Sequence, residues 1–135
     1  MSAERSGAPE ASVEDREIYV RDVAPEALAA WLEEALGVPL AARPRGRGLR
    51  LEGRTEAGAP VEILLVTDVP DRFVGVWCRR GPWPWPDDLA LARAARQALD
   101  AVVRCTAGGW SEREPEDERY WQLDEQGERT IPWRS

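Results

Sequence analysis

The alternation of apolar and polar positions is clearest between residues 61 and 79. Two β-rich runs, 61–67 and 73–79, flank a spacer, 68–72, that carries Pro70 and two aspartates. Proline and aspartate in such a spacer are typical of a turn, so the two runs are predicted to pair as neighbouring antiparallel strands. Because residues 63–66 are consecutively apolar, the first run is predicted to lie in the middle of the sheet, covered on both faces.

Apolar residues recur at helical spacing in two other segments. The first begins at Pro25, which suits the first turn of a helix, and ends before Gly37, a residue favoured just beyond a helix C-terminus. The second is predicted over 89–103, with Asp87 or Asp88 as its N-cap. Each helix has one apolar stripe, which in the first comprises Leu28, Trp31, Leu32, Ala35 and Leu36.

Shorter runs predict four further strands, at 17–23, 48–55, 120–124 and 130–133. Pro132 places the last of them at an edge of the sheet. The predicted fold class is α+β: one mostly antiparallel sheet of five or six strands with two helices on one face, in the order β-α-β-β-β-α-β-β. Residues 17–135 are predicted to form this single domain, and residues 1–16 are predicted to be a disordered N-terminal tail because they hold a single substantial aliphatic residue.

The charge distribution narrows the classes of partner. The net charge is −7, and the excess acid lies at the two ends: residues 1–17 carry five acids and two arginines, and residues 111–135 carry eight and four. An acidic surface repels nucleic acid and anionic lipid and attracts basic partners, so no nucleic-acid or membrane partner is expected. Because the chain shows no signal-peptide core and no segment long enough to span a bilayer, a cytoplasmic location is predicted.

The residue types that are missing narrow the chemistry. All 18 basic residues are arginine, and the chain has no lysine and no histidine. Ser-His and Cys-His nucleophiles, histidine zinc sites, Schiff bases and phosphate-binding P-loops are thereby excluded, so the protein is predicted not to be an enzyme and to need no cofactor or metal. Cys78 and Cys105 follow no metal-binding spacing and are predicted to be small buried residues; a disulfide between them is left open.

One basic cluster stands out against the acidic background. It comprises Arg43, Arg45, Arg47, Arg50 and Arg54, with Glu52 as the one acid among them. Such a cluster is either a patch for an anion or an acidic partner, or a solvated loop that leads into a strand. Gly46 and Gly48 favour the loop, because glycine leaves the backbone conformationally free.

The seven tryptophans divide into two groups. Trp31, on the first helix stripe, and Trp77, in a strand, are predicted to belong to the core. Trp83 and Trp85 lie in the run Gly-Pro-Trp-Pro-Trp-Pro, 81–86, whose alternating prolines impose an extended path. These two indoles either cap the end of the sheet or anchor a partner at an interface, where tryptophan often carries binding energy.

An acidic stretch follows Trp110. Its carboxylates are Glu112, Glu114, Glu116, Asp117 and Glu118. The stretch is either a solvated loop or a binding element that occupies the basic cleft of another protein and stands in for phosphate groups. The predicted partner-binding residues are therefore Trp83, Trp85, Trp110, Glu112, Glu114, Glu116, Asp117 and Glu118.

Three short motifs support a resemblance to a known family. They are Gly109-Trp110, the run Tyr-Trp-Gln-Leu-Asp at 120–124, and Ile131-Pro132-Trp133 near the end. Within a small acidic α+β chain that lacks histidine, they resemble immunity proteins of bacterial contact-dependent toxin systems. The resemblance implies a protein that binds and neutralises a cognate toxin without chemistry of its own. The element order is also similar to secretion-chaperone-like domains, although a leading strand at 17–23 departs from that layout.

The expected function is therefore that of a non-enzymatic protein-binding module, most specifically an immunity protein that masks the basic active-site surface of a toxin. The alternative is a dimeric secretion-chaperone-like adaptor, and the oligomeric state is left open. A third hypothesis is a small-ligand domain or carboxylate-dependent enzyme, with a cleft lined, for example, by Arg50, Arg79 and Asp68.

Overall fold

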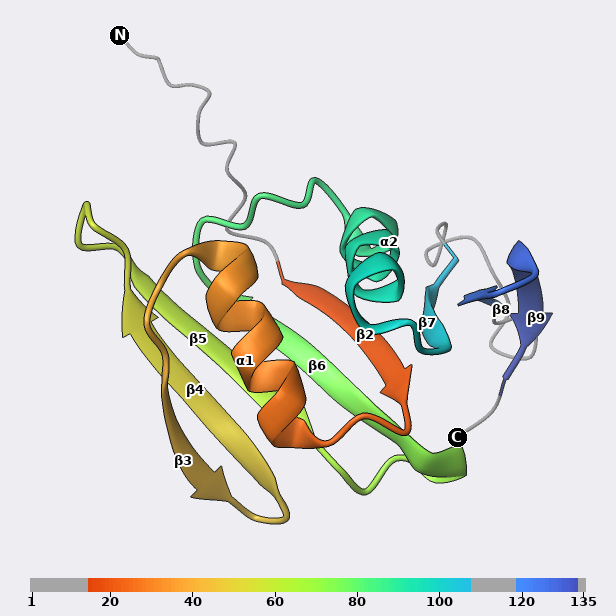
Figure 1. Cartoon of the computed structure of the whole chain (residues 1–135), viewed down its shortest axis with the longest axis horizontal. Coiled ribbons are helices and arrows are strands. Elements are labelled where there is room, and N and C mark those ends of the chain that lie inside the picture. Colours follow the sequence, from red (N-terminus) through yellow and green to blue (C-terminus); the bar gives the residue numbers. More distant parts are fainter. Residues whose placement is uncertain (1–14, 108–118, 134–135) are drawn as a thin grey trace, which may run out of the picture.

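A computed structural model of the chain describes residues 15–107 and 119–133. Within them, eight strands form one antiparallel sheet that carries two α-helices (Figure 1). The strands are β2 (Arg16–Arg21), β3 (Ala41–Arg45), β4 (Gly48–Arg54), β5 (Pro60–Val66), β6 (Phe73–Arg80), β7 (Val103–Thr106), β8 (Arg119–Asp124) and β9 (Gly127–Pro132). The helices are α1 (Pro25–Leu36) and α2 (Asp88–Leu99), and a short 3-10 turn, η2 (Pro70–Arg72), joins β5 to β6.

The strands lie in the order β3-β4-β5-β6-β2-β7-β8-β9. The predicted α+β class with an antiparallel sheet is confirmed, and β5 and β6 pair as expected across the turn at Pro70. The predicted number of five or six strands is wrong, because the structure has eight. The two strands that were missed are β3 and β7.

Each missed strand is held by pairing with neighbours and has a weak pattern of its own. All five residues of β3 are exposed, so the strand shows no apolar alternation, and it forms because a tight turn at Gly46 folds it back onto β4. The second helix was predicted to run to Val103, which is the first residue of β7, and residues 104–106 were given no element. That helix stops at Leu99 because Asp100 adopts a left-handed conformation (φ 53°) and its N–H donates to the carbonyl of Arg96 at 3.0 Å.

The first helix follows the prediction. Pro25 occupies its first turn, and Gly37 ends it in a left-handed conformation (φ 65°) with its N–H bonded to the Glu33 carbonyl. In α2, the Asp87 side chain caps the N-terminus by accepting from the Ala90 N–H at 2.8 Å. A side-chain cap therefore marks the start of α2, whereas α1 starts at a proline without a side-chain cap.

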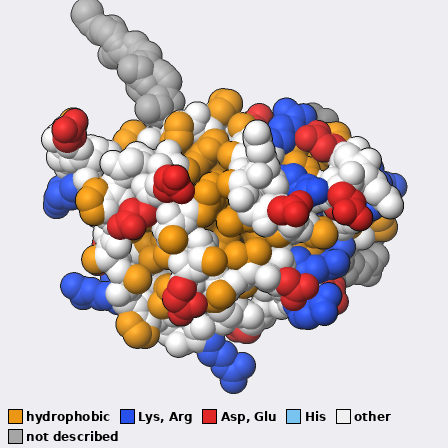
Figure 2. All heavy atoms as spheres, in the orientation of Figure 1, with side chains coloured by type: hydrophobic (Ala, Val, Ile, Leu, Met, Phe, Trp, Pro, Cys, Tyr) orange, Lys and Arg blue, Asp and Glu red, His pale blue; other side chains and the backbone are white. Residues whose placement is uncertain are grey.

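Both helices cover the same face of the sheet (Figure 1). Alternate strand residues point into this layer, among them Ile18, Val20, Ile63 and Val76, all fully buried. Figure 2 shows this side of the molecule, with apolar side chains gathered between α1 and α2. The two free cysteines, Cys78 on β6 and Cys105 on β7, are buried in the same layer. Because β2 lies between their strands, they are about 10 Å apart, too far for a disulfide.

The opposite, helix-free face holds a second apolar cluster, centred on Trp133. The Trp133 ring centroid lies 5.0 Å from that of Phe73, 5.2 Å from Tyr19 and 5.1 Å from Tyr120. The Arg104 guanidinium covers the ring at 4.6 Å, and the indole N–H donates to Asp71 at 3.2 Å. This cluster leaves Trp133 only 8% exposed.

The cluster brings the residue after β9 back to the centre of the sheet. Phe73 belongs to β6, and Trp133 directly follows β9, which is four places further along the strand order. Four places in a flat sheet separate strands by about 19 Å, yet the two rings are 5.0 Å apart. The curvature of the sheet and the chain beyond Pro132, where β9 ends, together bring Trp133 back over β6.

Proline protects both edges of the sheet. Pro44 lies in β3 and Pro132 in β9, the two outermost strands. Proline offers no N–H to an incoming strand and so discourages edge-to-edge association. The predicted edge position of Pro132 is confirmed. Arg16, which was assigned to the N-terminal tail, is instead a buried residue at the start of β2, while residues 1–14 lie outside the described ranges.

Replacing Trp133 with alanine is expected to lower the free energy of unfolding by about 3 kcal/mol, because it empties a site packed on three rings. Urea denaturation monitored by circular dichroism measures the change. The partly exposed Trp77→Ala is the matched control and should cost less. Equal effects of the two variants would contradict the role assigned to the Trp133 cluster.

Asp124, at the β8–β9 turn, predicts an acid-sensitive contribution to stability. Hydrogen bonds from Arg129 and then from Gln122 hold the pKa of Asp124 at about 2. Since an unfolded aspartate titrates near about 4, this contribution is complete above pH ~4 and is lost as the pH falls toward ~2. We expect Asp124→Asn to flatten the loss of stability between these pH values. A urea midpoint that falls as steeply in the variant would refute this.

Candidate functional site

The helix-free face of β4, β5 and β6 gathers arginine side chains. Leu51 of β4 is fully buried in the helix-covered layer, so its neighbours Arg50 and Glu52 point to the other side. Arg54, two residues beyond Glu52, shares that face. Arg50 and Arg54 thus lie in the strand predicted at 48–55, here β4. The loop interpretation is wrong for Arg43 and Arg45, which lie in β3, whereas Arg47 lies in the β3–β4 turn.

A β-bulge adds two arginines from β6. The β5–β6 register passes from Ile63 opposite Cys78 to Glu62 opposite Arg80, which leaves Arg79 as the extra residue. A bulge of this kind re-aims the side chains around it. Arg79 stacks on the Trp77 ring at 4.9 Å, and Arg80 reaches the same surface as Arg54. The adjacent pair Arg79-Arg80 is a signal in the sequence, but only the bulge turns both toward one face.

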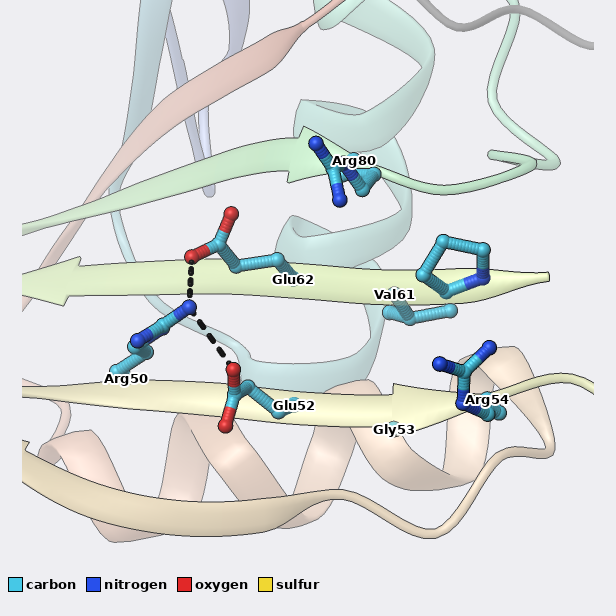
Figure 3. Close-up of a pocket in the computed structure, with 8 residues that line it drawn as sticks. Arg50, Glu52, Gly53, Arg54, Val61, Glu62 and Arg80 are labelled. Carbon is cyan, nitrogen blue, oxygen red and sulfur yellow. Dashed lines mark ion pairs between the residues drawn. The ribbon is translucent and has the colours of Figure 1, made fainter.

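A hollow of about 420 Å³ lies on this surface, among residues of β4, β5 and β6 (Figure 3). Its lining comprises Arg50, Glu52, Gly53, Arg54, Pro60, Val61, Glu62 and Arg80. Five of these eight residues are charged, three arginines against two glutamates, which leaves a balance of +1. The hollow is therefore a polar and slightly basic concavity on the sheet surface.

Arg50 is the fixed centre of the hollow. One of its terminal nitrogens lies 2.9 Å from the Glu52 carboxylate and 2.8 Å from that of Glu62, the two dashed contacts in Figure 3. Glu52 and Glu62 face each other directly across β4 and β5, where like charges repel. The Arg50 guanidinium offsets that repulsion, so both carboxylates are committed to it.

Arg54 and Arg80 are not neutralised in this way. Arg54 donates one hydrogen bond to the Gly58 carbonyl at 2.9 Å. Within residues 15–107 and 119–133, no carboxylate lies within ion-pair distance of Arg54 or Arg80. Both side chains line the hollow, Arg54 from β4 and Arg80 from β6, on opposite sides of β5 (Figure 3). They leave several N–H donors free for an anion.

Trp83 and Trp85 do not belong to this or any other exposed surface. They are 4% and 8% exposed, and their rings stack at 6.4 Å, with Trp85 a further 6.3 Å from Trp31 of α1. The prediction of exposed anchors is therefore wrong. The alternation explains why: Pro82, Pro84 and Pro86 are all exposed, so the extended path turns every second residue, the tryptophan, into the core.

A buried arginine fixes this connection. Arg16 is 4% exposed and donates from Nε to the Trp85 carbonyl and from a terminal nitrogen to the Pro86 carbonyl, both at 2.9 Å. Beside it, burial raises the pKa of Asp88, and burial raises the pKa of the Cys78 thiol. An uncharged thiol is a weak nucleophile. Arg16 therefore holds the segment 81–86 in place through its two hydrogen bonds to backbone carbonyls.

Trp77 does not lie where it was predicted. It was expected in the core, but it lies on the helix-free face, is partly exposed, and donates its indole N–H to Asp15 at 2.7 Å. It is the tryptophan that accompanies the arginines of the candidate site. The sequence contains a signal for this placement. Val74, Val76 and Cys78 alternate with Trp77, and alternate residues of a strand point to opposite faces.

The other predicted partner-binding residues, Trp110, Glu112, Glu114, Glu116, Asp117 and Glu118, lie outside the described residues. The segment that contains them connects β7 to β8, whose ends are joined by a hydrogen bond from Ala107 N–H to the Arg119 carbonyl at 3.0 Å. Asp68 does not meet Arg50 and Arg79: it follows the far end of β5 and lines a second hollow with Arg45 and Arg47.

Within the described ranges, no three cysteine, aspartate or glutamate side chains are placed to hold a metal ion. Neither α1 nor α2 is long and apolar enough to cross a membrane. Comparisons with protein-family models, curated proteins and solved structures found no match. The candidate site therefore rests on its own geometry.

Arg50→Gln tests the ion-pair arrangement. We expect it to lower the free energy of unfolding by about 0.5–1 kcal/mol, since it leaves two like charges facing each other on a partly exposed surface. The loss should shrink in high salt and be recovered by adding Glu52→Gln and Glu62→Gln. Arg47→Gln, in the β3–β4 turn away from these carboxylates, removes the same charge and is the matched control. A loss that salt does not change would contradict the charge argument.

Proposed function

We propose that this protein is a non-enzymatic binding module that presents the helix-free face of β4, β5 and β6 to a protein partner. The charged hollow carries the proposal. Sites for small molecules are mostly apolar with a few polar groups, whereas five of the eight residues that line this hollow are charged. Such a surface suits the charged side chains of another macromolecule.

The residue types on this face support the proposal. Arginine and tryptophan are enriched among the residues that carry binding energy at protein interfaces. Trp77 is partly exposed and stacks with Arg79. The stack orders the long Arg79 side chain before any partner arrives, which reduces the entropy lost on binding.

The more specific form of the proposal is that the partner is a cognate bacterial toxin, as the resemblance to immunity proteins implies. Two oppositely charged regions would then meet complementary regions of the toxin. The acidic residues Glu112 to Glu118 would steer the basic active-site surface, and the arginines of the candidate site would meet acidic side chains around it.

The test is co-expression and pull-down with the product of the neighbouring gene. We expect that product to be toxic alone, and to be bound and neutralised by this chain. Arg79→Glu should weaken the complex about tenfold or more, because it removes the stack on Trp77 and reverses a charge at the interface.

Arg47→Glu, in the exposed β3–β4 turn, changes the net charge equally and is the matched control. A neighbouring product that is neither toxic nor bound would contradict the toxin hypothesis. Equal weakening by both variants would contradict the assignment of the face. Light scattering separates the proposal from the dimeric-adaptor alternative, which requires a stable homodimer.

A further inference from the structure

We propose that Arg54 and Arg80 form an oxyanion site above Pro60, which takes one carboxylate or phosphate group. The proposal deepens the proposed function, because it assigns a ligand chemistry to one point of the binding face. Only the protein origin of the anion rests on that function. The two guanidinium groups themselves are the basis of the site.

The sheet places the two arginines on either side of one strand. Arg54 of β4 is opposite Pro60 at the start of β5, and Arg80 of β6 is opposite Glu62. β4 and β6 lie two strand spacings apart, about 10 Å. Two long side chains that rise from these strands can meet over a single anion. The pairing also offsets Arg80 from Arg54 by two residues along β5, and Figure 3 shows the two side chains on opposite sides of that strand, with Arg80 beside Glu62.

The β-bulge makes this pairing possible. In a regular ladder, residues 78 and 80 would share a face, and Cys78 is fully buried under the helices. The extra residue, Arg79, shifts the alternation, so that Arg80 lines the hollow on the helix-free side. The irregular pairing thus delivers the second guanidinium group to the site.

The donors of Arg54 and Arg80 are available because Arg50 occupies the nearby acids. Glu62 is the carboxylate closest in register to Arg80, yet it is bonded to Arg50 at 2.8 Å and only 17% exposed. Arg54 uses one nitrogen on the Gly58 carbonyl. A guanidinium has five N–H donors in a planar fork that matches the oxygens of carboxylate and phosphate.

The two glutamates also restrict what enters. An anion that approached Arg50 would meet Glu52 and Glu62, so it is repelled from that end of the hollow. The favourable place is the end beside Pro60, where no carboxylate among the described residues makes an ion pair with Arg54 or Arg80. The site is therefore suited to a compact oxyanion or to the tip of an acidic side chain.

The experiment is a titration followed by backbone amide NMR, with inorganic phosphate and a hexaglutamate peptide as probes. Sodium chloride at matched ionic strength is the reference for screening. We expect saturable shifts of the Gly53, Val61 and Glu62 amides, which line the hollow. In the double variant Arg54→Gln/Arg80→Gln, the apparent affinity should fall about tenfold or more.

Arg45→Gln/Arg47→Gln removes the same net charge from the far end of the β3–β4 hairpin and should leave the titration unchanged. Melting curves confirm that both variants fold. Saturation by phosphate alone supports the site with a free anion as its ligand, and tighter saturation by hexaglutamate supports a protein carboxylate.

Linear shifts that follow sodium chloride, or shifts that persist in Arg54→Gln/Arg80→Gln, would overturn the site. This result is independent of the pull-down. If the chain binds the anion but not the neighbouring gene product, the anion site stands and the toxin hypothesis is contradicted. If the chain binds the gene product but not the anion, only the anion site is contradicted.

Discussion

The pairing of β2 with β6 on one side and β7 on the other holds the whole sheet together. β3 to β6 follow one another along the chain and form one meander, and β7 to β9 form another. β2, from the start of the described chain, lies between the two meanders and pairs with β6 over six residues. Its Ile18 and Val20 are fully buried beneath the helices. These contacts are distant in sequence, so closing them costs chain entropy that the burial of apolar side chains must offset.

The two faces of this sheet have different roles. The helix-covered face holds the main core and receives the tryptophans of the segment 81–86. The other face is divided along the strand order. At one end, the curl of the sheet closes Tyr19, Phe73 and Trp133 into a small aromatic cluster. At the other end, the strands remain open and carry ordered ion pairs and unpaired guanidinium groups. The candidate site therefore lies on the part of this face that the aromatic cluster does not cover.

Arginine is the basic residue throughout this chain, and the structure uses it in three environments. Arg16 is buried and holds a loop through backbone carbonyls. Arg104 lies between two aromatic rings, where burial and then the nearby Arg21 lower its pKa. Arg54 and Arg80 face the solvent at the hollow. A planar, delocalised and weakly hydrated guanidinium tolerates all three settings, whereas an ammonium group keeps its water more strongly.

Local chemistry in the sequence was enough to determine the first helix, the start of the second and the central hairpin. Pro25, Gly37 and Asp87 act on neighbouring backbone groups, and the apolar run of β5 needs cover on both faces wherever it lies. The tertiary structure decided the strands β3 and β7, because β3 has no apolar pattern of its own and the alternation in β7 spans only four residues. It alone also decided which side of the alternating segment 81–86 turns into the core, and it placed Arg54 and Arg80 on the lining of one hollow. Those outcomes depend on register, on a bulge and on which strand lies alongside which, and such relations between distant residues leave no periodic trace in the chain.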